Sequence, residues 1–211
     1  MVETYLRLSP LSQLGLEGHG AAKRTEGDGV ALGEIAFRGT VNLRLDPSDT
    51  ATREAAEGAL PCSLPTTVGD TASGGSGKAS KVTALCLGPD EWWLIAADGP
   101  ELTEKLKNAL AEHHAAVTDI SENWTTLQVS GPKARDLLAK ACPLDLHPSK
   151  FPAGHCAQSL GAKADITLLL VEDGKDGPVF ELWVRRSFAA YLWAWLEDAA
   201  QEYGLTVVKC G

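Results

Sequence analysis

The stretch Leu127-Gln128-Val129-Ser130-Gly131-Pro132 decides the fold, because its pattern occurs twice in the chain. Its alternating apolar residues predict a strand. Its proline falls in the first turn of a following helix, where the missing N–H costs nothing. Leu43-Arg44-Leu45-Asp46-Pro47 has the same pattern, somewhat over eighty residues earlier. The same order of elements follows each stretch, which indicates an internal repeat.

The first copy of the repeat covers residues 40–120. Apolar residues at period 2 predict strands, and apolar residues at helical spacing predict helices. Ser48 or Asp49 is expected to cap the first helix, because either side chain can accept a backbone N–H. The expected elements are strand 40–45, helix 48–60, strands 81–87 and 92–96, a helix with apolar positions from Leu102 to His113, and strand 116–120.

The second copy covers residues 125–208. Ser187 is expected to cap its last helix, and Gly204 is expected to end that helix. The expected elements are strand 125–129, a helix starting at 130–132, a strand at 156–160, strands 166–171 and 179–184, helix 188–203 and strand 205–208.

Each half therefore has the order β-α-β-β-α-β, the split-βαβ arrangement, and the fold class is α+β. We expect two tandem half-repeats, at about 31–120 and 121–211, within a single domain over 31–211. Residues 1–30 show no sustained period, which predicts an irregular N-terminal arm. Residues 66–80 are rich in Gly and Ser, which predicts a flexible loop.

Composition and charge exclude several classes of function. The net charge is -9 and no run of Lys and Arg is present. Nucleic acid is therefore not an expected partner, because phosphate affinity comes from clustered cations. No stretch approaches the roughly 20 apolar residues that span a bilayer. The first residues show no secretory signal. Scattered cysteines, odd in number, fit reduced thiols, so a cytoplasmic protein is expected. They are Cys62, Cys86, Cys142, Cys156 and Cys210.

Gly74-Gly75-Ser76-Gly77-Lys78 resembles a phosphate-binding loop only in part. That motif needs a further Gly before the Gly-Lys pair and a Ser or Thr after it. Ala72 and Ala79 stand at these two positions, and no strand directly precedes the loop. A mobile loop is the favoured interpretation.

Cys142, His147, His155 and Cys156 are zinc-type ligands within a short window. Structural zinc sites use close pairs two to four residues apart, which this spacing does not supply. Separate turn and core positions are therefore favoured. No Ser elbow, HExxH or GxGxxG motif is present, and no cysteine is marked as activated. We expect no catalytic, cofactor-binding or metal-binding residue in this chain.

The densest apolar segment runs from Phe180 to Leu196. Its helix is apolar nearly all round for two turns, which is typical of a helix buried on more than one side. Trp193 and Trp195 point about 160° apart on that helix. Adjacent strand residues such as Trp92 and Trp93 point to opposite sheet faces. These apolar side chains are covered either by the domain's own core or by a partner protein. The candidate subunit-interface residues are Trp92, Trp93, Tyr191, Trp193 and Trp195.

Several segments resemble known families. Val117–Ser121, Leu127–Ala134 and Leu137-Leu138 are similar to the folate-binding domain of the glycine-cleavage T-protein. His147-Pro148, Phe151, Gly154 and Phe180–Leu192 complete a pattern that resembles the gamma-subunit family of heterotetrameric sarcosine oxidase. The resemblance covers roughly residues 30–205.

The resemblance implies a subunit of an alpha, beta, gamma and delta assembly that oxidises sarcosine to glycine. Hydrogen peroxide is formed, and formaldehyde or methylenetetrahydrofolate carries the methyl carbon. FAD, FMN and NAD are implied on alpha and beta, tetrahydrofolate on alpha, zinc on delta, and no cofactor on gamma. The implied role of this chain is structural, with alpha as its main contact.

Two alternatives remain open at this point. The first is a stand-alone aminomethyltransferase or folate-binding protein, although such proteins are usually longer, with a further barrel domain. The second is the equivalent subunit of a related N-methyl amino acid oxidase or dehydrogenase.

Overall fold

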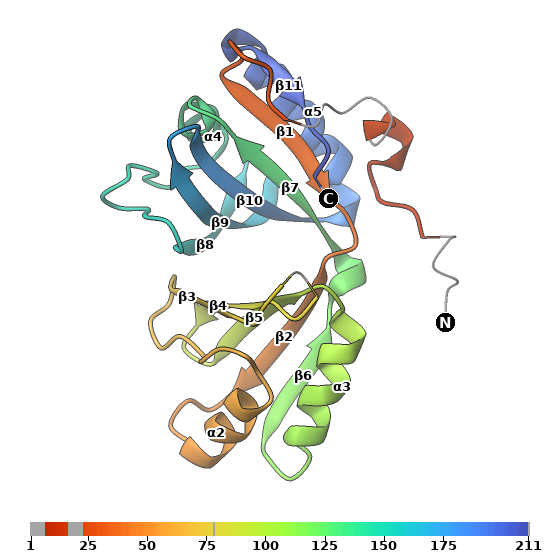
Figure 1. Cartoon of the computed structure of the whole chain (residues 1–211), viewed down its shortest axis with the longest axis vertical. Coiled ribbons are helices and arrows are strands. Elements are labelled where there is room, and N and C mark those ends of the chain that lie inside the picture. Colours follow the sequence, from red (N-terminus) through yellow and green to blue (C-terminus); the bar gives the residue numbers. More distant parts are fainter. Residues whose placement is uncertain (1–6, 17–22, 78, 211) are drawn as a thin grey trace. The chain divides into compact units, whose positions relative to one another are not determined.

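The computed structural model describes residues 7–16, 23–77 and 79–210, and the chain falls into two compact units (Figure 1). Unit 1 consists of Met1–Phe37, Trp124–Ala153 and Gln158–Gly211, and unit 2 of Arg38–Asn123 and Gly154–Ala157. Each unit has one β-sheet with helices packed against it. The predicted α+β class is confirmed. No helix among the described residues is long and apolar enough to cross a bilayer.

Unit 2 is built on a five-stranded antiparallel sheet. The strand order is β3 (Thr71–Gly74), β4 (Val82–Gly88), β5 (Glu91–Ala96), β2 (Gly39–Leu45) and β6 (Ala115–Asp119). Its two helices are α2 (Thr50–Gly58) and α3 (Gly99–Ala109).

Both helices of unit 2 begin after a capping aspartate. Asp49 accepts a hydrogen bond from Thr52 N at 3.1 Å, and Asp98 accepts one from Glu101 N at 3.0 Å. Each bond satisfies a backbone donor that has no partner within the helix. The predicted cap at Asp49 is thereby confirmed, while Ser48 donates instead to Asp46.

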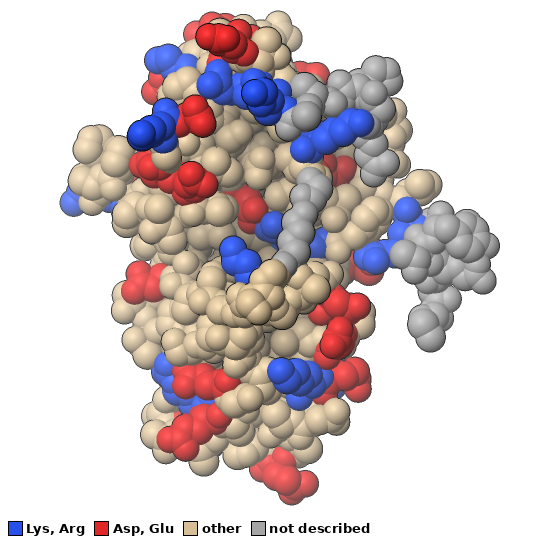
Figure 2. All heavy atoms as spheres, in the orientation of Figure 1, with Lys and Arg blue, Asp and Glu red and all other residues tan. Residues whose placement is uncertain are grey.

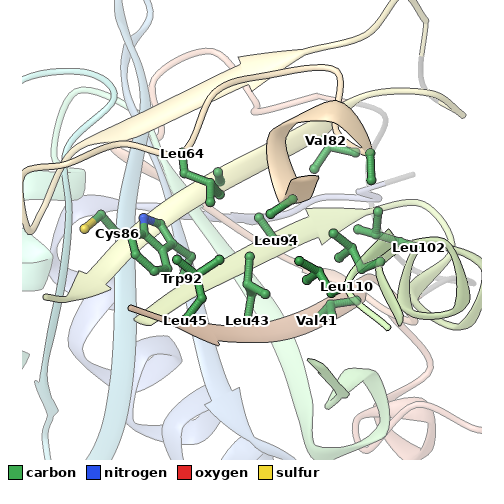
Figure 3. Close-up of a cluster of buried hydrophobic side chains, with 14 residues drawn as sticks. Val41, Leu43, Leu45, Leu64, Val82, Cys86, Trp92, Leu94, Leu102 and Leu110 are labelled. Carbon is green, nitrogen blue, oxygen red and sulfur yellow. The ribbon is translucent and has the colours of Figure 1, made fainter. Parts of the chain in front are cut away.

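A buried cluster joins these helices to one face of the sheet (Figure 3). The strands contribute every second residue and the helices contribute residues three or four apart, as their geometries require. Its larger members are Val41, Leu43, Leu45, Leu64, Val82, Trp92, Leu94, Leu102, Leu106 and Leu110. The alternation seen in the sequence of this unit thus marks its core.

Unit 1 is built on a six-stranded sheet. The strand order is β11 (Leu205–Val207), β1 (Val30–Ile35), β7 (Trp124–Ser130), β10 (Gly177–Arg185), β9 (Ala164–Gly174) and β8 (Cys156–Gly161). The helices are α4 (Ala134–Ala141) and α5 (Ala189–Ala200). Four 3-10 turns complete the described elements of the chain: η2 (Ser12–Leu14), η3 (Ser121–Asn123), η4 (Arg186–Phe188) and η5 (Gln201–Tyr203).

One face of this sheet carries the core of unit 1. Leu127 and Val129 of β7 stand opposite Leu182 and Phe180 of β10, and all four are buried. The guanidinium of Arg135, on α4, lies 5.4 Å from the centre of the Phe180 ring, so α4 covers this face. The buried side chains of α4 and α5 complete the core.

The two sheets share a strand order with one difference. In unit 2 the repeat elements stand in the order β4-β5-β2-β6. In unit 1 the corresponding order is β9-β10-β7-β11, but β1 lies between β7 and β11. Residues 31–35 were expected in the first half and instead pair within the sheet of the second. The reason is that both partners of β1 are distant in sequence, so its pairing leaves no local pattern.

The position of β1 also changes the expected tandem arrangement. β1 and β7 are antiparallel, with Ile35 opposite Thr126, so the chain leaves and re-enters unit 1 at neighbouring positions. Within unit 2, Thr40 N donates to Ser121 Oγ at 3.0 Å, so the two ends of Arg38–Asn123 also lie together. Most of unit 2 is therefore an insertion between two paired strands of unit 1.

Two local predictions are corrected. Part of the expected loop 66–80 forms β3, which pairs with β4 from Thr71↔Leu85 to Gly74↔Val82. Ser187 does not cap α5, because β10 runs directly into η4 and Phe188 occupies the cap position without a side-chain hydrogen bond. Gly204 does end the helical segment, with a φ of 74° that follows η5.

The described part of the N-terminal arm is anchored to unit 1. Leu11 is 1% exposed. Ser9 Oγ and Thr125 Oγ1 both donate to the Glu34 carboxylate, each at 2.6 Å. Apart from η2, residues 7–15 and 23–29 form no helix or strand, and β1 begins at Val30. Residues 1–6 and 17–22 of the predicted arm lie outside the described residues.

Candidate partner interface

Three of the five candidate interface residues are buried within the chain. Trp92 is 1% exposed, belongs to the core cluster of unit 2 (Figure 3) and donates its Nε1–H to Pro65 O at 2.8 Å. Trp93 is 4% exposed and Trp193 3%. These side chains contribute to the stability of the fold, and as they stand they offer almost no area to a partner.

Trp93 is buried together with its neighbours on the sheet. Trp92 belongs to the helix-covered face of this sheet, and Trp93 points to the other face. Leu85 and Ile95 share the opposite face with Trp93, and both are also buried. Both faces of the sheet are therefore apolar, and each face carries a buried tryptophan.

The remaining two candidates lie on the surface of α5. Tyr191 is 39% exposed and Trp195 is half-buried. Phe188, directly before the helix, is 44% exposed. The spacing 188, 191, 195 places these rings in one row along the helix, because residues three and four apart are neighbours. We name Phe188, Tyr191 and Trp195 the aromatic stripe.

The orientation of the stripe is fixed by the buried residues on the opposite side of α5. Its buried residues follow the helical repeat and are Ala189, Leu192, Trp193, Leu196 and Ala200. Rotating the helix to hide the stripe would expose these side chains, at about 25 cal/mol per Å² of apolar surface. Trp193 and Trp195 point to opposite sides of α5, as predicted. Trp193 faces the core, and Trp195 faces the surface.

Cationic and apolar groups lie at the N-terminal end of the stripe. Arg186 Nη2 donates to Leu8 O at 3.0 Å, which ties the N-terminal arm to η4. Leu8 itself is 67% exposed. The guanidinium of Arg185 lies 4.8 Å from the centre of the Trp124 ring, at the start of β7. Sequence reasoning missed Phe188, Leu8 and Arg185, although the spacing of Phe188 from Tyr191 was a usable signal.

Such a grouping differs from ordinary surface exposure. Single exposed apolar residues are normal on any protein, whereas contiguous ones rimmed by polar groups mark interaction sites. Tyr, Trp and Arg are also the residue types enriched at interface hot spots. On the face drawn in Figure 2, acidic and basic side chains are interspersed with uncharged surface.

The Gly-rich segment that resembled a phosphate loop has a different structure. Gly74 ends β3, and the next regular element is β4 rather than a helix. A phosphate loop depends on the helix N-terminus that follows it. Lys78 of this motif lies outside the described residues.

The zinc-type residues have local contacts within their own units. Cys142 Sγ contacts Ser159 Oγ in unit 1, and His147 Nδ1 lies 2.8 Å from Ser149 Oγ in the same unit. His155 and Cys156 belong to unit 2. Over residues 7–16, 23–77 and 79–210, no three His, Cys, Asp or Glu side chains are grouped to hold a metal ion.

The environment of the buried cysteines of unit 2 opposes formation of the thiolate. Burial raises the pKa of the Cys156 thiol to about 12, and it also raises the pKa of Cys86. Cys156 Sγ lies 3.9 Å from Cys86 O and 4.0 Å from Asp70 O, both backbone acceptors that suit a protonated thiol. An activated cysteine has the opposite surroundings, cationic and partly exposed.

Comparison with known proteins identifies relatives over nearly the whole chain. The model of the sarcosine oxidase gamma-subunit family matches residues 44–202. Sarcosine oxidase subunit gamma of Corynebacterium sp. (strain U-96) is 35% identical over 205 residues, which cover 97% of this chain and 95% of that protein. The solved heterotetrameric sarcosine oxidase of Corynebacterium sp. U-96, in complex with pyrrole 2-carboxylate, contains a similar chain. That chain matches this one with a TM-score of 0.81 at 33% identity, and the match covers 94% of this chain and 96% of that chain.

A second solved structure shares the fold alone. The glycine cleavage system aminomethyltransferase T of Bartonella henselae matches with a TM-score of 0.68 at 14% identity. The match covers 96% of this chain and 59% of that chain. The predicted T-protein-like fold is confirmed.

Proposed function

Because the chain belongs to the sarcosine oxidase gamma-subunit family, we propose that it is the non-catalytic gamma subunit of a cytoplasmic heterotetrameric sarcosine oxidase. The observation that carries the proposal is the nearly complete mutual coverage with a chain of the Corynebacterium enzyme. Nearly all of this chain thus aligns with nearly all of one chain of that enzyme.

In this proposal the chemistry belongs to the other subunits. The assembly demethylates sarcosine oxidatively to glycine, with hydrogen peroxide and formaldehyde or methylenetetrahydrofolate as further products. FAD, FMN, NAD, tetrahydrofolate and zinc are held by alpha, beta and delta. This chain supports alpha through contacts on its surface. The raised pKa values of its buried thiols in unit 2 favour that division of roles.

The proposal is tested by purification of a tagged gamma chain expressed together with the alpha, beta and delta subunits of its source. We expect the four chains to elute as one species with a visible flavin spectrum and sarcosine-dependent peroxide formation. The gamma chain expressed alone should be colourless. A gamma chain that elutes without other subunits under these conditions would rule out the proposal.

Two further measurements separate the alternatives. Titration of the isolated chain with tetrahydrofolate, followed by calorimetry, should give no binding heat if the chain is purely structural. Tight binding would favour a folate-binding protein instead. Rates of the purified complex with sarcosine and with other N-methyl amino acids identify its amine substrate.

A further inference from the structure

We propose that residues 208–210, which we name the clasp, lock β1 into the sheet of unit 1 and limit how often this strand opens. The clasp follows β11, crosses β1 and reaches β7. It is a conformational device within unit 1. The inference goes beyond the proposed function and does not depend on it.

The strands that pair with β1 are both distant in sequence. β7 is antiparallel to it and begins at Trp124, and β11 is parallel to it and begins at Leu205. The contacts of β1 must therefore offset the entropy that is lost in closing two long loops. Elements with few buried contacts open most readily, so each further contact on β1 slows its opening.

The clasp contacts β1 and also the strand beyond it. Val208 N donates to Leu32 O at 2.8 Å, which extends the pairing of β11 with β1 by one residue. The Val208 side chain is 7% exposed. Cys210 Sγ lies 3.4 Å from Gln128 Oε1, and Gln128 stands opposite Gly33 in the ladder of β1 and β7. The clasp therefore bridges β1 and β7 across the face of the sheet.

Gly33 provides the space that the clasp occupies. A Cβ at this position would collide with Cys210 Sγ and would lie 2.8 Å from Val208 O and 3.1 Å from Val208 Cγ2. These three nearest atoms all belong to the clasp. Glycine inside a strand weakens it, and it often marks a site where another backbone approaches closely. The clasp thus lies directly over β1 at Gly33.

The clasp covers the face of β1 that points away from the core. Leu32 stands opposite the core residue Val129, and the next pair in the ladder is Gly33 and Gln128. Successive strand residues point to opposite faces, so the core lies on one side of β1 and the clasp on the other. β1 is therefore enclosed on both faces and at both edges. It can leave the sheet only after the clasp has moved.

The experiment compares Gly33→Ala in the full chain with the same change in a chain that ends at Val207. Hydrogen exchange of peptides that contain Val30–Ile35, followed by mass spectrometry, measures the opening of β1. Urea unfolding shows whether each chain is folded. Gly58→Ala is the matched control, because a Cβ at Gly58 meets nothing within 4 Å.

In the full chain, Gly33→Ala should speed exchange of the β1 amides about tenfold or more, because the added methyl group displaces the clasp. In the chain that ends at Val207, these amides should already exchange faster than in the full chain. Gly33→Ala should then change their rate little, since both changes remove the same contacts and their effects do not add. Gly58→Ala should leave the exchange of β1 unchanged.

An effect of Gly33→Ala that is equally large in both chain lengths would overturn the inference, because the added methyl group would then collide with something other than the clasp. Exchange of β1 that is as slow in the chain ending at Val207 as in the full chain would also overturn it. If the shortened chain does not fold, Cys210→Ala in the full chain decides. Faster exchange of β1 in that variant supports the clasp, and unchanged exchange overturns it.

Discussion

Cys156 illustrates how the surroundings of one residue decide its chemistry. The side chain is 1% exposed, and its backbone N–H donates to Gly69 O at 2.7 Å. Burial opposes formation of the thiolate, because a charged sulfur would lose its hydration without gaining a cation. The pKa of the thiol is therefore raised to about 12 from its ordinary value of 9.0.

This pKa predicts slow alkylation of Cys156 in the folded protein. Thiolate is the reactive form, and at pH 8 a pKa of about 12 leaves roughly one thiol in ten thousand ionised. We expect iodoacetamide to modify the partly exposed Cys62 and Cys210 first, and Cys156 about a thousandfold more slowly than in urea-unfolded chain. Mass spectrometry of tryptic peptides over time gives the rates. Equal rates for Cys156 in folded and unfolded chain would contradict the assignment.

Among elements, α2 depends strongly on its cap. The helix has only nine residues, and isolated helices of that length are marginal in water. Asp49 accepts both the backbone N–H and the hydroxyl of Thr52, and that hydroxyl also lies 3.0 Å from His113 Nδ1. The cap therefore connects the start of α2 to the segment that follows α3.

We predict that Asp49→Ala lowers the free energy of unfolding by about 1–2 kcal/mol, since the variant leaves capping donors without an acceptor. Urea unfolding followed by far-UV circular dichroism measures the change. Glu54→Ala, on the exposed side of the same helix, is the control and should stay within about 0.5 kcal/mol of the wild type. A loss at Asp49 no larger than at Glu54 would show that the cap contributes little.

Local elements could be predicted well from the sequence. The alternation of Leu43 and Leu45 and the aspartate before Thr50 act within a few residues, so β2 and α2 follow from local pattern. β1 could not be predicted, because its place in the sheet depends on pairing with β7 and β11, which lie far away in sequence. β3 was missed for a related reason. Its Gly and Ser residues show no apolar alternation, and they form a strand because they pair with β4.

The candidate interface was predicted only in part. Helical geometry correctly placed Trp193 and Trp195 on opposed sides of α5. Which of them faces the core depends on the packing of that helix in unit 1, which a single sequence does not contain. The same limit applies to Trp93, because period 2 assigns its face but not whether that face is covered.

At the scale of the whole molecule, the insertion of most of unit 2 between β1 and β7 determines which parts of the chain can fold alone. A fragment of residues 121–211 lacks β1, so β7 and β11 lose the strand that lies between them. Unit 2 in turn uses Gly154–Ala157, where Thr71 Oγ1 donates to Gly154 O at 2.7 Å. Neither predicted half-repeat is therefore complete in itself.

We predict that unit 1 folds when residues 38–123 are replaced by Asn-Gly. Because β1 and β7 are antiparallel neighbours, a two-residue turn of this type can connect them directly. The shortened chain should unfold cooperatively in urea, with a lower midpoint than the full chain. Residues 121–211 alone, as the matched control, should show no cooperative transition. If this fragment unfolds as cooperatively as the shortened chain, β1 is dispensable and the prediction is wrong.

The insertion has a consequence for the order in which the protein forms during synthesis. Val30–Ile35 leaves the ribosome early, but its partners Trp124–Ser130 and Leu205–Val207 are made much later. All five strands of the unit 2 sheet are complete by Asp119. We therefore expect the sheet of unit 2 to form on the nascent chain before Gly154–Ala157 is made, while β1 stays unpaired and exposed to chaperones and to other strand edges. β1 is the first strand of the polypeptide, and it is thus among the last to pair with its neighbours.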